Sequence, residues 1–170
     1  TKAYLDKVCW WLRTQRSAEI PTEWVMPTHG VIFFLATALR AFTEPGDGMI
    51  MLTPGYRRYR QAASRLGRIT IESPLVLREG RYWMDFRDLE SKMKEKNNRI
   101  LVLCNPNNPT GTVWQNQELS GLAGLAEEHN VIVFSDEIFS EIVFNGADAP
   151  VYSLFAGEKG NSISCFSLGK

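Results

Sequence analysis

Short runs of apolar and β-branched residues alternate along the chain with longer stretches whose apolar positions recur at helical spacing. Five short runs have the usual length of a strand, at residues 49–53, 69–72, 100–104, 131–135 and 162–166. Helical patterns occupy residues 2–16, 31–42, 56–66, 86–96 and 115–128. This alternation predicts βαβ units and a mainly parallel sheet.

The most apolar segments indicate how the sheet is covered. The runs ILVLC at 100–104 and VIVFS at 131–135 lack polar alternation, which is typical of strands buried on both faces. Residues 31–42 are almost continuously apolar and predict a buried helix. We therefore expect a three-layer αβα fold, with helices on both faces of the sheet, formed as one domain by residues 1–170.

Composition narrows the classes of function. The chain has 170 residues, of which 44% are hydrophobic, and its 19 basic and 19 acidic residues cancel. Zero net charge argues against binding nucleic acid through phosphate attraction. No apolar run reaches the 18 residues of a membrane span, so no membrane association is expected.

The three cysteines, Cys9, Cys104 and Cys165, lie far apart and form no CxxC pair. Neither a disulfide framework nor a metal site is therefore expected, and a cytoplasmic location fits. Cys104 and Cys165 fall within apolar runs, which predicts that both thiols are buried.

Polar side chains follow three of the predicted strands. NPNNPTG at 105–111 follows the third strand, Asp136 and Glu137 follow the fourth, and SLGK at 167–170 follows the fifth. Ligands of open parallel sheets bind beyond the carboxyl ends of the strands, so these groups are candidates for one site. Gly30 precedes the helix at 31–42, where free N–H groups can bind phosphate.

Each candidate also has an ordinary structural interpretation. Asp136 is a good helix N-cap and Asn108 suits an Asx turn. Tyr56 and Ile138 fit a hydrophobic core, and Lys170 fits a solvated surface.

The combined motifs resemble the fold type I enzymes that depend on pyridoxal 5'-phosphate (PLP). NPNNPTG is similar to their asparagine loop, SDEI to their aspartate strand end and SLGK to their lysine segment. The order agrees, with 28 residues from Asn108 to Asp136 and 34 more to Lys170. The stretches PTEWVMPTHGVI, TPGYRRY and GRYWMDFRDLE most resemble carbon–sulfur lyases of the cystathionine β-lyase type.

This resemblance implies a role for each group around the PLP ring. Lys170 would form the Schiff base with the cofactor and shuttle a proton. Asp136 would pair with the pyridine nitrogen, and Asn108 would donate a hydrogen bond to the ring oxygen. Tyr56 and Ile138 would cover the two ring faces.

The resemblance also implies a phosphate site and one departure from the family pattern. The backbone amides of Gly30, Val31 and Ile32, together with the Ser167 hydroxyl, would bind the phosphate. Relatives commonly place Tyr or His at the position of Phe139, so one hydrogen bond to the ring oxygen is missing.

Three functions remain open at this point. The first is a β-lyase that cleaves cysteine thioethers to a thiol, pyruvate and ammonia. The second is an aminotransferase of class I or II, and the third is a non-catalytic fragment that binds partners. The resemblance implies a small amino-acid substrate, a homodimer, and a chain that is part of the PLP-binding large domain without its smaller C-terminal domain.

Overall fold

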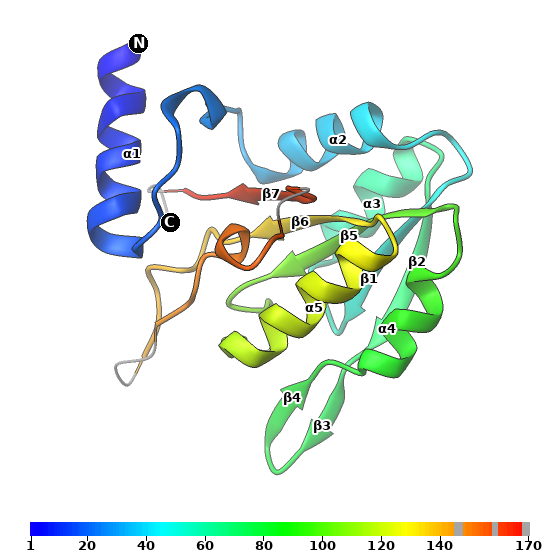
Figure 1. Ribbon diagram of the computed structural model, residues 1–170. Coiled ribbons are helices and arrows are strands. Elements are labelled where there is room, and N and C mark those ends of the chain that lie inside the picture. The colour runs from blue at the N-terminus through cyan, green and yellow to red at the C-terminus, as the bar shows by residue number, and fades with distance from the viewer. Residues whose placement is uncertain (145–147, 158–159, 168–170) are drawn as a thin grey trace.

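Five parallel strands form the central sheet of the computed structural model, which describes residues 1–144, 148–157 and 160–167 (Figure 1). Their order across the sheet is β2-β1-β5-β6-β7, and every neighbouring pair is parallel. The strands are β1 (Gly48–Thr53), β2 (Ile69–Pro74), β5 (Asn98–Cys104), β6 (Ile132–Asp136) and β7 (Ser162–Cys165). The predicted parallel sheet is confirmed.

Helices cover both faces of this sheet. They are α2 (Val31–Phe42), α3 (Arg57–Arg65), α4 (Phe86–Met93) and α5 (Asn116–Glu128). Helix α1 (Lys2–Arg16) lies to the side of the sheet and packs in a small separate cluster with Ala18 and Val151 (Figure 1). Short turns of 3₁₀-helix lie at Thr22–Trp24 and Tyr152–Leu154. Helices α2 and α3 share one hydrophobic core with the sheet, and α4 and α5 share the other, which confirms the three-layer fold.

Successive residues of the inner strands enter opposite cores. In β1, Met49 contributes to the core under α2 and α3, whereas Ile50 contributes to the core under α4 and α5. Phe134 and Val133 divide in the same way in β6. Because side chains alternate along a strand, a strand covered on both faces needs apolar residues at every position.

The prediction of a buried helix at 31–42 is wrong in part. Leu35, Ala38 and Leu39 are buried, but Phe33 is 56% exposed and Phe42 is 46% exposed. Helix α2 belongs to an outer layer, so the sheet contacts only one of its sides. Continuous apolar sequence does not distinguish such a helix from one enclosed on all sides.

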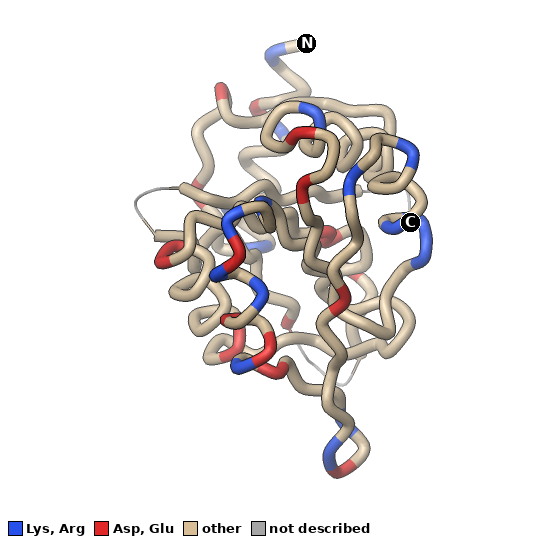
Figure 2. The backbone as a smooth tube through the Cα atoms, turned by 90° about the vertical axis from the view of Figure 1, so that its right-hand side faces the viewer, with Lys and Arg blue, Asp and Glu red and all other residues tan. Residues whose placement is uncertain are grey.

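An antiparallel hairpin was not among the predicted elements. Its strands are β3 (Val76–Arg78) and β4 (Arg81–Trp83), and it projects away from the body of the domain (Figures 1 and 2). Strands of three residues are too short to show a period.

The positions of the charged residues and of the cysteines are consistent with the sequence analysis. In the view of Figure 2, basic and acidic residues are interspersed along the chain. Cys104 and Cys165 are buried, which confirms the predicted burial of both thiols, and Cys9 is half-buried. Across the described residues, none of the helices has the length and apolar content needed to cross a bilayer.

A buried arginine attaches helix α1 to the rest of the domain. Arg16 donates hydrogen bonds to the carbonyl oxygens of Ser140, at 3.1 Å, and Ala149. It also forms an ion pair of 2.8 Å with Glu141. Nearby, the rings of Trp11 and Phe166 pack edge to face with their centroids 6.3 Å apart.

Replacing Arg16 should therefore destabilise the fold. In Arg16→Ala the two carbonyl groups lose their donor, and we expect a loss of about 3 kcal/mol in the free energy of unfolding. Urea unfolding measures this change. Arg13→Ala, on an exposed position of the same helix, is the matched control and should stay within about 0.5 kcal/mol of the parent. Equal losses in the two variants would contradict this role.

Candidate active site

Three neighbouring strands end at one edge of the sheet and deliver most of the predicted site residues. Cys104 of β5 and Cys165 of β7 both lie opposite Asp136 of β6, so the strands end level with one another. The amide of Asn105 donates to the carbonyl of Asp136 at 2.9 Å. Helix α2 begins at the same edge (Figure 1). Lys170 lies outside the described residues.

Asp136 is the central group of this edge and is 1% exposed. Its Oδ1 accepts a hydrogen bond from the amide of Ile138 at 3.2 Å, and its Oδ2 accepts one from the hydroxyl of Tyr59. Residues 138–141 form a turn, so Asp136 does not cap a helix. Two donors from the described part of the chain therefore bind this buried carboxylate, as a buried charge requires.

The side chains of the three asparagines in the loop at 105–111 differ in their hydrogen bonds. Asn105 is buried, accepts from the amide of Trp114 at 3.2 Å and donates to the carbonyl of Pro150 at 2.9 Å. Asn107 donates to the hydroxyl of Thr110 at 2.9 Å. Asn108 is half-buried, and its carboxamide has no hydrogen bond to another described residue. Asn108 is therefore the asparagine best suited to bind a ligand.

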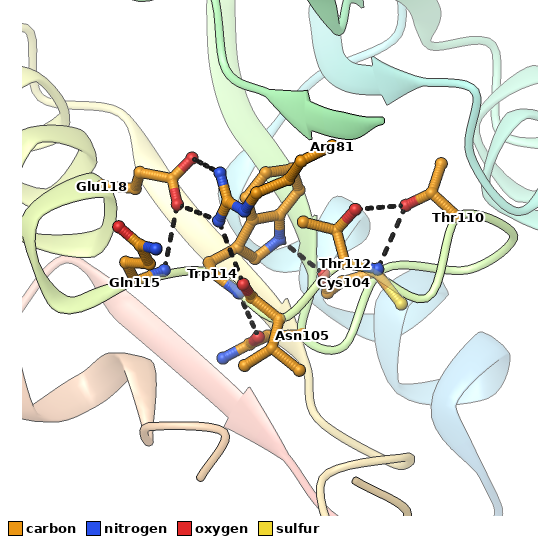
Figure 3. Close-up of polar contacts among 9 residues, drawn as sticks. Arg81, Cys104, Asn105, Thr110, Thr112, Trp114, Gln115 and Glu118 are labelled. Carbon is orange, nitrogen blue, oxygen red and sulfur yellow. Dashed lines mark hydrogen bonds and ion pairs between the residues drawn. The ribbon is translucent and has the colours of Figure 1, made fainter. Parts of the chain in front are cut away.

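A polar network fixes the end of this loop (Figure 3). The indole N–H of Trp114 donates to the carbonyl of Cys104 at 2.8 Å. Arg81, from the hairpin, donates to the carbonyl of Val113 at 3.1 Å and forms an ion pair of 2.5 Å with Glu118 of α5. The hairpin thus joins the end of the loop to helix α5 through Arg81.

The start of α2 is a candidate anion site. Gly30 has a φ of +108°, which other residues rarely adopt, and a Cβ at this position would meet nothing within 4 Å. No side chain caps the helix, and the amides of Val31 and Ile32 have no acceptor within it because they lie in its first turn. Open N–H groups and the helix dipole together favour a phosphate.

The remaining predicted residues lie around Asp136. Tyr56 is half-buried at the start of α3, and its ring packs edge to face on Tyr59 at 5.4 Å between centroids. Ile138 and Phe139 are half-buried in the turn after β6, and Ser167 is half-buried after β7.

Comparison with known proteins decides the family. The model of the family described as aminotransferase class I and II matches residues 2–170. The chain belongs to this family. Cystathionine beta-lyase PatB of Bacillus subtilis is 34% identical over 166 residues, which are 97% of this chain and 43% of that protein. The aspartate aminotransferase of Sulfolobus acidocaldarius is 32% identical over 141 residues, 82% of this chain and 35% of that protein.

Solved structures agree with this family assignment. Cystalysin from Treponema denticola, whose structure contains PLP, has a TM-score of 0.94 and 32% identity. The PLP-bound C–S lyase from Staphylococcus hominis has a TM-score of 0.93 and 26% identity. Each match covers 98% of this chain and 43% of the other. This class I and II family member therefore spans well under half the length of the relatives it matches.

Two buried groups of this family member were not predicted from sequence. Tyr59 was seen only as part of the stretch TPGYRRY, although its spacing of three from Tyr56 indicates a shared helix face. Glu137 was seen only as the neighbour of Asp136.

Glu137 is buried beside Asp136 in very different surroundings. Its Oε1 accepts hydrogen bonds from the hydroxyls of Ser135 at 2.8 Å and Ser164 at 3.0 Å, and from the amide of Tyr152 at 3.0 Å. Its Oε2 is buried without a partner among the described residues. Burial raises the pKa of Glu137 to about 7, because the loss of water outweighs these hydrogen bonds.

Stability should therefore decrease as the pH rises. The ordinary pKa of Glu137 is 4.5 and its folded value is about 7, so the folded state holds a proton that the unfolded state releases across this interval. The free energy of unfolding should fall by about 3 kcal/mol from low pH to above pH 7 through this group. Denaturant unfolding at several pH values measures the slope.

Glu137→Gln should remove this part of the pH dependence, and Glu19→Gln, at an exposed position after helix α1, should leave it unchanged. A slope that is the same in the parent and in Glu137→Gln would show that the carboxyl of Glu137 does not titrate in this interval.

Proposed function

We propose that this protein binds PLP at the edge where β5, β6 and β7 end. The observation that carries the proposal is the buried carboxylate of Asp136, level with the asparagine loop and at the edge where α2 begins. PLP has a phosphate, a ring nitrogen and a ring oxygen, and this edge offers a complementary group for each. When bound, PLP withdraws electrons from the substrate bonds that are to be broken.

The start of α2 would hold the phosphate. The amides of Gly30, Val31 and Ile32 provide donors on a helix that no side chain caps, and the hydroxyl of Ser167 adds a further donor. Charge and hydrogen-bonding type both suit a phosphate.

The pyridine ring would lie between this phosphate site and Asp136. The carboxylate of Asp136 would hold the ring nitrogen in its protonated form, and the carboxamide of Asn108 would donate to the ring oxygen. Tyr56 and Ile138 would pack on its faces, and Phe139 would add no hydrogen bond. In this arrangement residues 1–170 act as part of the PLP-binding large domain.

Lys170 would bind the cofactor covalently and move a proton at the substrate Cα. An amine is required because it condenses reversibly with an aldehyde and then serves as a base. This role rests on the SLGK motif that follows β7.

For the reaction, we propose β-elimination from a cysteine thioether. Lys170 removes the α-proton and the sulfur leaves Cβ as the thiol. The remaining enamine reacts with water to give pyruvate and ammonia. The similarity to PatB and to the two lyase structures supports this class.

The second candidate is transamination, which the similarity to the Sulfolobus aspartate aminotransferase supports. Either reaction would take a small amino acid as substrate. For either one we propose a homodimer. Exposed apolar side chains before and within α2, among them Trp24, Met26 and Phe33, support an association surface.

An assay with L-cystathionine separates the two reactions. The lyase should release pyruvate from the PLP-loaded protein in the absence of any keto acid. An aminotransferase should form a new keto acid only after an acceptor keto acid is added. Absence of pyruvate, together with a keto acid of intact cystathionine that forms only when an acceptor is present, would overturn the lyase proposal and favour the second candidate.

The roles of Lys170 and Asp136 can be separated by two variants. Lys170→Ala should abolish the borohydride-reducible link to PLP, since the amine is gone. Asp136→Asn should keep that link but lose about 10²–10³ in rate, because a neutral ring nitrogen accepts electrons poorly. Asp148→Asn, at an exposed position, is the control and should turn over at the parent rate. A reducible link in Lys170→Ala, or full activity in Asp136→Asn, would show these roles to be wrong.

A further inference from the structure

A tyrosine from helix α3 reaches the carboxylate of the candidate site. Tyr59 is 2% exposed, and its hydroxyl donates to Oδ2 of Asp136. The other oxygen, Oδ1, accepts from the amide of Ile138. An ionised carboxylate accepts about four hydrogen bonds, so Asp136 can bind this phenol and a ligand N–H at the same time.

The neighbours of the Tyr59 hydroxyl keep it a donor. Burial, followed by the nearby Cys104 and Asp136, raises the pKa of Tyr59 far above its ordinary value. Burial also raises the pKa of Cys104 to about 12 and the pKa of Cys165 above its ordinary value. At neutral pH the phenol and both thiols are therefore uncharged.

The orientation of Tyr59 is fixed by packing. Ala62 and Ala63, on the same side of α3, are buried against the sheet, and Tyr56 contacts the Tyr59 ring at 86° between ring planes. The phenol thus approaches Asp136 from a helix that is packed on the sheet, whereas the Ile138 amide belongs to the turn that follows β6.

We propose that Tyr59 is a positioning residue that keeps the proton shared between Asp136 and the bound cofactor on the ring nitrogen. This inference rests on the proposed function. A hydrogen bond to a charged acceptor is roughly twice as strong as one to a neutral acceptor. The phenol therefore stabilises the carboxylate more than the carboxylic acid, and so favours the ion pair over the neutral pair in which the proton has moved from the nitrogen to Asp136.

Nitrogen NMR of the protein loaded with PLP, isotope-labelled at the ring nitrogen, tests this inference. Tyr59→Phe removes only the hydroxyl, and the ratio of protonated to unprotonated nitrogen should fall by about tenfold. Asp136→Asn marks the signal expected without the ion pair. Tyr152→Phe is the matched control, because Tyr152 is equally buried but lies under helix α5 in the other core, and it should keep the parent signal.

The ratio of the affinities for PLP and for a PLP analogue provides a second measurement. A general loss of packing would not change this ratio. Deaza-PLP, in which carbon replaces the ring nitrogen, cannot form the ion pair with Asp136. Tyr59→Phe should therefore lower the preference for PLP over deaza-PLP by about tenfold, whereas a purely structural defect weakens both equally.

Failure of the role proposed for Tyr59 and failure of PLP binding give different results. If the parent binds PLP and Tyr59→Phe keeps both the parent nitrogen signal and the parent selectivity, only the role of Tyr59 is wrong. If the parent does not bind PLP at all, the proposed function fails, and the inference about Tyr59 fails with it.

Discussion

The burial of one carboxylate governs the architecture of the candidate site. A carboxylate removed from water is costly unless donors surround it, and Asp136 is 1% exposed. Its donors come from the following turn, through Ile138, and from helix α3, through Tyr59. Strand register, helix packing and turn geometry must therefore all be correct for this group to be accommodated.

The alternation of side chains along β6 gives two neighbouring carboxyl groups opposite environments. Asp136 lies on the same side of the strand as Phe134, facing α2 and α3, where Tyr59 donates to it. Glu137 lies on the side of Ser135, where burial raises its pKa to about 7. One carboxyl group thus lies at the strand ends that form the candidate site, while the other connects β6 to β7 and to the backbone at Tyr152.

The fold by itself does not choose between the candidate reactions. The relatives of this chain include lyases and aminotransferases at similar identities, 34% for PatB and 32% for the Sulfolobus enzyme. Both reactions begin with loss of the same proton, so they use the same cofactor groups. The difference depends on residues that face the substrate side chain, and the chain spans only 43% of the length of PatB.

The sequence alone determined the sheet, its five main helices and the family, because these depend on local periodicity and on short motifs with fixed spacing. It also identified Asp136 and Asn108, since each follows a strand in a recognisable motif. Only the tertiary structure decided that the side chains of Asn105 and Asn107 form hydrogen bonds that hold the loop, whereas Asn108 is half-buried and its carboxamide does not bond to another described residue. The contact between Tyr59 and Asp136 joins residues 77 positions apart, and it exists only because α3 packs on β1 and β2, on the face of the sheet toward which Asp136 points. Local pattern cannot encode such a contact, because the packing of distant elements determines it.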